Sequence, residues 1–143
     1  MNDQRQRVLA EAMEWLGTPF HDCSAVKGAG VDCAHFVHAC YVAAGVIGDQ
    51  HIQPYSPQHM MHRDEELFLG YVLATGAREI ALAEAQPADL IIYRIGRVYA
   101  HGALAIAWPD RIIHAHMQSG RVLISSAFEC DLRGRQARAF SFW

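Results

Sequence analysis

The chain has 143 residues, of which 19% are charged and 52% hydrophobic, and its formal net charge is −3 with neutral histidines. This length and composition predict a single folded domain over residues 1–143 and exclude a disordered chain. The slightly acidic balance, without a basic cluster, argues against nucleic acid as a partner.

The beginning of the sequence lacks the features of a secretion signal. Residues 1–7 are mostly polar, and no long apolar stretch follows them. A secretory signal needs an apolar core of about 7 to 15 residues, and a membrane-spanning helix needs about 20. We therefore expect synthesis in the cytoplasm without a signal peptide, and we expect no membrane span.

The first half of the chain has apolar residues at helical spacing in three segments. Asp3 is the predicted cap of the first helix, over residues 4–16. The second helix is predicted to begin at Asp32 and Cys33 and to run to about residue 44. The third, with Asp64 as its predicted cap, ends near residue 76.

After residue 88 the pattern changes to short apolar or alternating segments separated by turns, which is typical of antiparallel strands. Five strands are predicted, over residues 89–93, 100–107, 111–115, 122–125 and 139–142. Helices followed by strands indicate an α+β fold. We expect N-terminal helices packed on a C-terminal antiparallel sheet of about five strands.

Cys33 differs in its context from the other three cysteines, because it lies at the predicted start of the second helix. Free backbone N–H groups and the positive end of the helix dipole favour a thiolate there. The same N–H groups can stabilise the oxyanion formed during amide cleavage. The position therefore predicts an activated nucleophile, with a pKa below that of an ordinary thiol.

Two of the nine histidines are placed to assist such a nucleophile. His101 begins one predicted strand and His114 ends the next, and a hairpin at residues 108–110 brings these strands side by side. His101 can take the thiol proton while His114 fixes its tautomer. The spacing alone leaves open a structural role, in which a buried cysteine and two hydrogen-bonded histidines have no catalytic function.

A zinc site is the competing chemistry for these side chains. Cys33, His101 and His114 are possible zinc ligands, but structural zinc sites favour closely spaced ligand pairs. Around His101 and His114, the only such pair is His114 with His116. We expect no metal and no other cofactor.

Five short motifs follow one another along the chain: Leu16-Gly17-Thr18-Pro19-Phe20, Gly30-Val31-Asp32-Cys33, Gln86-Pro87-Ala88-Asp89-Leu90-Ile91-Ile92-Tyr93, His101-Gly102-Ala103 and Ile113-His114-Ala115. In this order they resemble the motifs of the NlpC-type cell-wall cysteine endopeptidases, from about residue 5 to the C-terminus. Residues 25–30, 55–57 and 139–142 resemble the phage-encoded branch, which is found in tail modules and gene-transfer agents.

The resemblance implies a papain-like fold, with Cys33 as nucleophile, His101 as base and acid, and His114 as the orienting third residue. His116 competes with His114 for that role, because residues i and i+2 of a strand share a face. The implied substrate is a peptidoglycan stem peptide, cut between D-glutamate and a diamino acid. Phage tail proteins are the implied partners, and a virion tail is the implied location.

The chain departs from the family pattern at two positions near the implied site. Phe20 stands where the family often has a tyrosine, and His35 stands where it usually has glycine. His21, Asp22 or backbone amides are candidates to replace the missing hydroxyl near the oxyanion. His35 is expected to narrow the cleft or add an imidazole.

The remaining candidates are Asp32, which we interpret as a helix cap, and His116, which can line the cleft. Two alternatives to a peptidase therefore stay open. One is a tail docking module with a vestigial site. The other is a thiol acyltransferase or amidase acting on another γ-glutamyl-type substrate.

Overall fold

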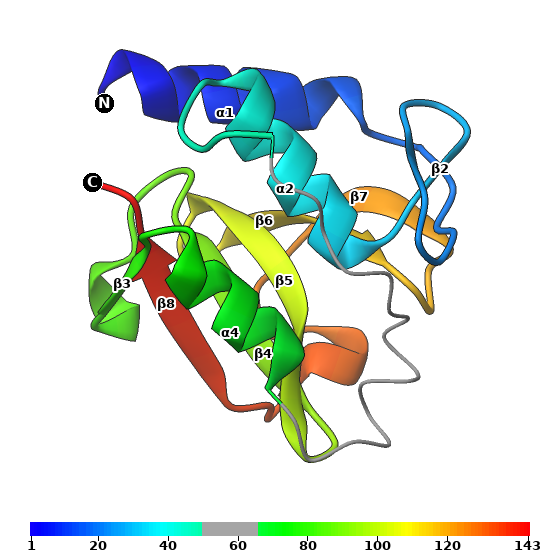
Figure 1. The fold of residues 1–143 in the computed structure, drawn as a ribbon. Coiled ribbons are helices and arrows are strands. Elements are labelled where there is room, and N and C mark those ends of the chain that lie inside the picture. The colour runs from blue at the N-terminus through cyan, green and yellow to red at the C-terminus, as the bar shows by residue number, and fades with distance from the viewer. Residues whose placement is uncertain (50–65) are drawn as a thin grey trace.

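The computed structural model describes residues 1–49 and 66–143. Its helices are α1 (Asp3–Glu14), α2 (Cys33–Ala43) and α4 (Leu67–Ala74), with short 3-10 helices η1 (Leu82–Glu84) and η2 (Cys130–Leu132). Its strands are β1 (Ala25–Val26), β2 (Gly30–Val31), β3 (Arg78–Ile80), β4 (Leu90–Ile95), β5 (Val98–Ala107), β6 (Arg111–His116), β7 (Arg121–Ser125) and β8 (Ala137–Ser141). Helices α2 and α4 pack on β5, and α1 packs on α2 (Figure 1).

The main sheet has the strand order β3-β8-β4-β5-β6-β7, and every neighbouring pair is antiparallel. The predicted α+β fold is confirmed, and all five predicted strands are present. The sixth strand of this main sheet, β3, was not predicted. Its three residues, Arg78 to Ile80, carry two charges and no apolar alternation. Only pairing with β8, about sixty residues later, makes this segment a strand.

Side-chain caps set the starts of the first two helices. The predicted cap Asp3 is wrong, since the Asn2 side chain accepts from the Arg5 amide at 2.8 Å. Asp32 caps α2 as predicted. The predicted cap Asp64 and the phage-like segment 55–57 lie outside the described residues.

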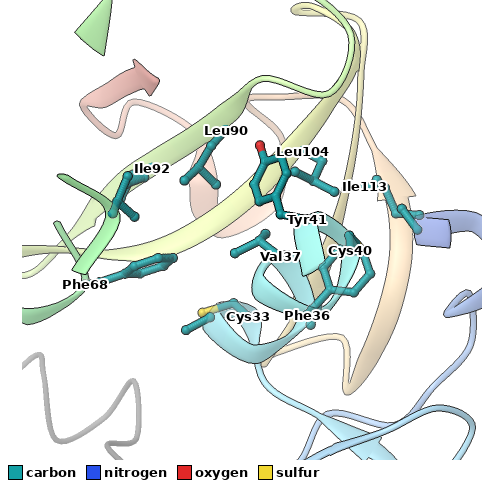
Figure 2. Close-up of a cluster of buried hydrophobic side chains, with 14 of the residues drawn as sticks. Cys33, Phe36, Val37, Cys40, Tyr41, Phe68, Leu90, Ile92, Leu104 and Ile113 are labelled. Carbon is teal, nitrogen blue, oxygen red and sulfur yellow. The ribbon is translucent and has the colours of Figure 1, made fainter. Parts of the chain in front are cut away.

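The main core lies between the helices and one face of the sheet. Figure 2 shows Val37 and Tyr41 of α2 pointing toward Leu90 and Leu104 of the sheet. The Tyr41 hydroxyl is buried and donates to the Ala88 carbonyl at 2.7 Å, so it carries no unsatisfied polar atom into the core. This packing holds α2 against the sheet.

Residues from the opposite face of the sheet form a second, smaller core. Alternate strand residues, among them Ile91, Ala103 and Ile112, point to this side, where Leu132 of η2 covers them. The segment that connects β7 to β8 is therefore anchored over this face. No helix in the described part of the chain is long and apolar enough to cross a membrane.

Candidate active site

Asp32 holds the first turn of α2 in place. Its Oδ1 atom accepts from the His35 amide at 2.8 Å and lies 2.8 Å from His35 Nδ1. Its Oδ2 atom accepts from the Cys23 amide at 2.7 Å, which ties the preceding loop to the helix. This buried carboxylate positions Cys33, the first residue of the helix.

The Cys33 thiol lies against strand β5 and donates to the Ala100 carbonyl, with Sγ 3.5 Å from the oxygen. Strand β5 pairs with β6 from the turn only as far as Leu104 and Ile113. The thiol contacts β5 at Ala100, beyond the last residues that pair with β6. Figure 2 shows Cys33 at the start of α2, on the side toward Phe68. The side chain is buried among apolar groups.

Burial, with a smaller contribution from the negative charge of Asp32, raises the pKa of Cys33 to about 12. The amides of Gly102, Ala34 and Cys33 itself lower it, but by less. The predicted low pKa is therefore wrong for this structure. Desolvation of a thiolate outweighs the favourable helix terminus, and Cys33 is a neutral thiol in its resting position.

A chain of hydrogen bonds crosses the three strands that follow β4. His101 Nε2 of β5 lies 2.8 Å from His114 Nδ1 of β6. His114 Nε2 lies 2.8 Å from the Ser125 hydroxyl of β7, which donates to the Ser126 carbonyl at 3.0 Å. The predicted hairpin thus brings the two histidines together. The orienting contact to His101 comes from His114.

The directions of these hydrogen bonds define both tautomers. Ser125 has one proton, and without it in between, its oxygen and the Ser126 carbonyl oxygen would repel each other at 3.0 Å. His114 must therefore donate from Nε2 to Ser125 and accept at Nδ1. It follows that His101 donates from Nε2, so its Nδ1 carries a lone pair. Within the described residues this Nδ1 atom has no hydrogen-bond partner.

Both histidines are neutral at ordinary pH. Burial, with a smaller contribution from His116, lowers the pKa of His101 to about 3. Burial likewise lowers the pKa of His114 to about 2, with smaller contributions from His101 and His116. A neutral His101 is the form that can accept a proton.

A cavity of about 150 Å³ lies at this end of the sheet. Its walls are formed by Phe20, Cys33, Ile95, Ala100, His101, His116, Met117, Gln118, Asp131 and Arg135. His116 lies 2.6 Å from Asp131 Oδ1 and 2.6 Å from the Ser119 hydroxyl, so it forms a separate pair beside the His101–His114 chain. Within residues 1–49 and 66–143, no three His, Cys, Asp or Glu side chains are arranged so that they could hold a metal ion.

Of the other predicted site residues, all within the described part of the chain, only Phe20 lines this cavity. Phe20 lines the cavity, as expected of a residue near the nucleophile. His21 and Asp22 are exposed and do not line it. His35 does not narrow the cavity, because its ring is bonded to Asp32.

Ser125 and Asp131 were missed by the sequence analysis. His114 is opposite Leu123 in the β6–β7 register, which makes Ser125 a diagonal neighbour on the same face. Strand alternation therefore carried a weak signal for Ser125. Asp131 lies in the irregular β7–β8 connection, where no periodic pattern predicts which side chains point inward.

No protein-family model matches the sequence, and no curated protein matches it either. The structure is similar to the NlpC/p60 domain of the peptidoglycan hydrolase SagA, with a TM-score of 0.65, 19% identity, and 99% of each chain covered. It is also similar to the peptidoglycan hydrolase RipB from Mycobacterium tuberculosis, with a TM-score of 0.65 and 19% identity, covering 97% of this chain and 64% of that one.

A third similar structure is RipD from Mycobacterium tuberculosis, a non-catalytic NlpC/p60 domain protein adapted to peptidoglycan binding. Its TM-score is 0.64 at 14% identity, with 99% of this chain and 98% of that chain covered. The same fold thus occurs with and without catalytic activity, so the fold leaves the activity of this chain open. Together these likenesses give the chain the NlpC/p60 fold.

Proposed function

We propose that the chain is a cysteine peptidase that hydrolyses an amide bond in a peptidoglycan stem peptide. Cys33 is the nucleophile, His101 the general base and acid, and His114 the residue that orients His101. The observation that carries the proposal is the hydrogen-bond chain from Ser125 to His101. It leaves an unpartnered lone pair on Nδ1 of a residue that lines the same cavity as the thiol.

The reaction begins when His101 Nδ1 takes the Cys33 proton and Sγ attacks the carbonyl carbon of the substrate. Backbone amides at the start of α2 stabilise the oxyanion. His101 then donates the proton to the leaving amine as the C–N bond breaks, which leaves a thioester. Water attacks the thioester, His101 takes its proton, and the carboxylic acid and the free thiol are released.

Thiol and imidazole are both neutral before the substrate binds, so proton transfer accompanies the attack instead of preceding it. The thiol bonds to Ala100 in the resting state, and rotation about its Cα–Cβ bond is needed to engage His101. Catalytic hydrogen bonds often tighten only when substrate is bound. A substrate carbonyl beside the start of α2 would favour this rotation.

The proposed bond is the one between D-glutamate and a diamino acid, and the proposed setting is a phage or prophage tail. Both rest on the motif resemblance, which includes residues 25–30 and 139–142. Mass spectrometry of peptides released from purified sacculi would identify the bond. Detection of the protein in purified tail particles would support the setting, and its absence from them would contradict it.

Turnover of purified muropeptides by wild type and by Cys33→Ala tests the proposed reaction. We expect the variant to lose hydrolysis while its melting temperature stays near wild type. Cys130→Ala is the matched control, because Cys130 is exposed and does not line the cavity. Hydrolysis that persists in Cys33→Ala would exclude Cys33 as the nucleophile.

A second candidate function is a non-catalytic peptidoglycan-binding module. The position of the thiol favours it, because Cys33 bonds to Ala100 and burial raises its pKa. The likeness to RipD also supports it. Tight binding of muropeptides by the wild-type protein without any product over long incubation would favour this candidate.

A further inference from the structure

Arg135 contributes a positive charge to the wall of the cavity that Cys33 and His101 also line. It lies between η2 and β8, and its side chain is half-buried. Its Nε atom donates to the Asp131 carbonyl at 2.9 Å, which restrains the guanidinium group. Neither of its Nη atoms has a hydrogen-bond or ion-pair partner among the described residues.

The nearby acidic side chain does not neutralise Arg135. Asp131 Oδ1 lies 2.6 Å from His116 Nε2, and no ion pair joins the Asp131 carboxylate to Arg135. The cavity wall therefore contains the hydrogen-bonded pair of His116 and Asp131 and one cation, Arg135, that has no counter-ion in the described residues. A half-buried guanidinium with free donors is well suited to an incoming anion, because partial desolvation strengthens the interaction.

We propose that Arg135 binds a free carboxylate of the substrate next to the bond that is cleaved. This inference rests on the proposed function and narrows its substrate to acidic peptides. The planar guanidinium offers its two Nη groups to the two oxygens of a carboxylate. A D-glutamyl residue linked through its side chain retains such a group on its α-carbon, in the same residue as the attacked carbonyl.

A pair of synthetic stem peptides tests the proposal, one with the free α-carboxylate and one with this group amidated. Calorimetry with Cys33→Ala measures their binding without turnover. We expect the acid to bind about tenfold more tightly or better, as for hydrogen bonds between charged groups. Adding Arg135→Gln should remove this preference, and adding Arg135→Lys should retain part of it.

Arg133→Gln is the matched control, since it removes the same charge from an exposed residue of the same connection that does not line the cavity. This variant should keep the preference for the acid. A preference that persists in Arg135→Gln, or none in Cys33→Ala itself, would overturn the role of Arg135 alone. Failure of both peptides to bind Cys33→Ala and to be cleaved by wild type would overturn the proposed function as well.

Discussion

The two faces of strands β5 and β6 differ in what determines their side chains. Toward the helices, Ala100, Leu104 and Ile113 are buried in the main core. On the opposite face, His101 and His114 are also buried, but a directed hydrogen-bond chain holds them. Apolar packing tolerates many side chains of similar volume, whereas the polar chain needs particular atoms at particular positions. The thiol lies with the first face and its proposed base with the second.

The largest expected effect comes from the polar face. His101→Gln should lower the turnover of muropeptides by about 10² to 10⁴-fold, because an amide cannot act as a general base. The melting temperature of this variant should stay near that of the wild type. Steady-state kinetics on a defined stem peptide gives the measurement. A variant that retains most of the wild-type kcat would remove His101 from the mechanism.

A substitution on the apolar face should act on stability. A Cβ added to Gly102 would lie 2.7 Å from Cζ of Phe68, which packs α4 on β5. Gly102→Ala should therefore reduce the free energy of unfolding by about 1 to 3 kcal/mol, as for other overpacked cores. Urea denaturation measures this change.

Gly70→Ala is the control for this substitution. Gly70 is in α4, and its added Cβ would meet nothing within 4 Å. This variant should be neutral or more stable, because alanine favours a helix more than glycine does. Equal destabilisation by both variants would show that contact with Phe68 is not the cause.

The buried histidines should make stability depend on pH. The pKa values of about 3 for His101 and about 2 for His114 lie below the ordinary value of 6.5. The unfolded chain therefore takes up protons below pH 6.5 that the folded chain does not bind. Stability that is fully present above pH 6.5 is lost as the pH falls toward 3.

Each histidine contributes about 1.4 kcal/mol per pH unit to this loss. His114→Gln keeps an acceptor for His101 and a donor for Ser125, and it should reduce the slope by about that amount. Denaturation curves between pH 4 and 6.5 would measure it. Parallel curves for the variant and wild type would mean that His114 is not held neutral in the folded state.

The smallest expected effect concerns Ser125, which determines the tautomer of His114. Ser125→Ala removes one hydrogen bond, worth about 0.5 to 1.5 kcal/mol. We expect kcat to fall by a few-fold to about tenfold with little change in KM. Ser125→Thr, which keeps the hydroxyl, should restore most of the activity. A rise in KM with an unchanged kcat would instead indicate a role of Ser125 in substrate binding.

Local patterns in the sequence were sufficient for much of this description. The cap at Asp32 and the start of α2 at Cys33 follow from short-range hydrogen bonding, which acts within a few residues. Strand alternation and the hairpin at residues 108–110 predicted that His101 and His114 meet. The α+β order followed from the succession of helical and strand patterns along the chain.

Tertiary structure alone decided the properties that depend on burial and on distant partners. The pKa of Cys33 is raised because α2 and β5 exclude water from the thiol, which no local pattern encodes. Strand β3 exists only through its pairing with β8. Arg135 and Asp131 reach the cavity from an irregular connection. Helix capping and strand alternation act between near neighbours, whereas solvent exclusion and cavity walls require segments far apart in the chain to come together.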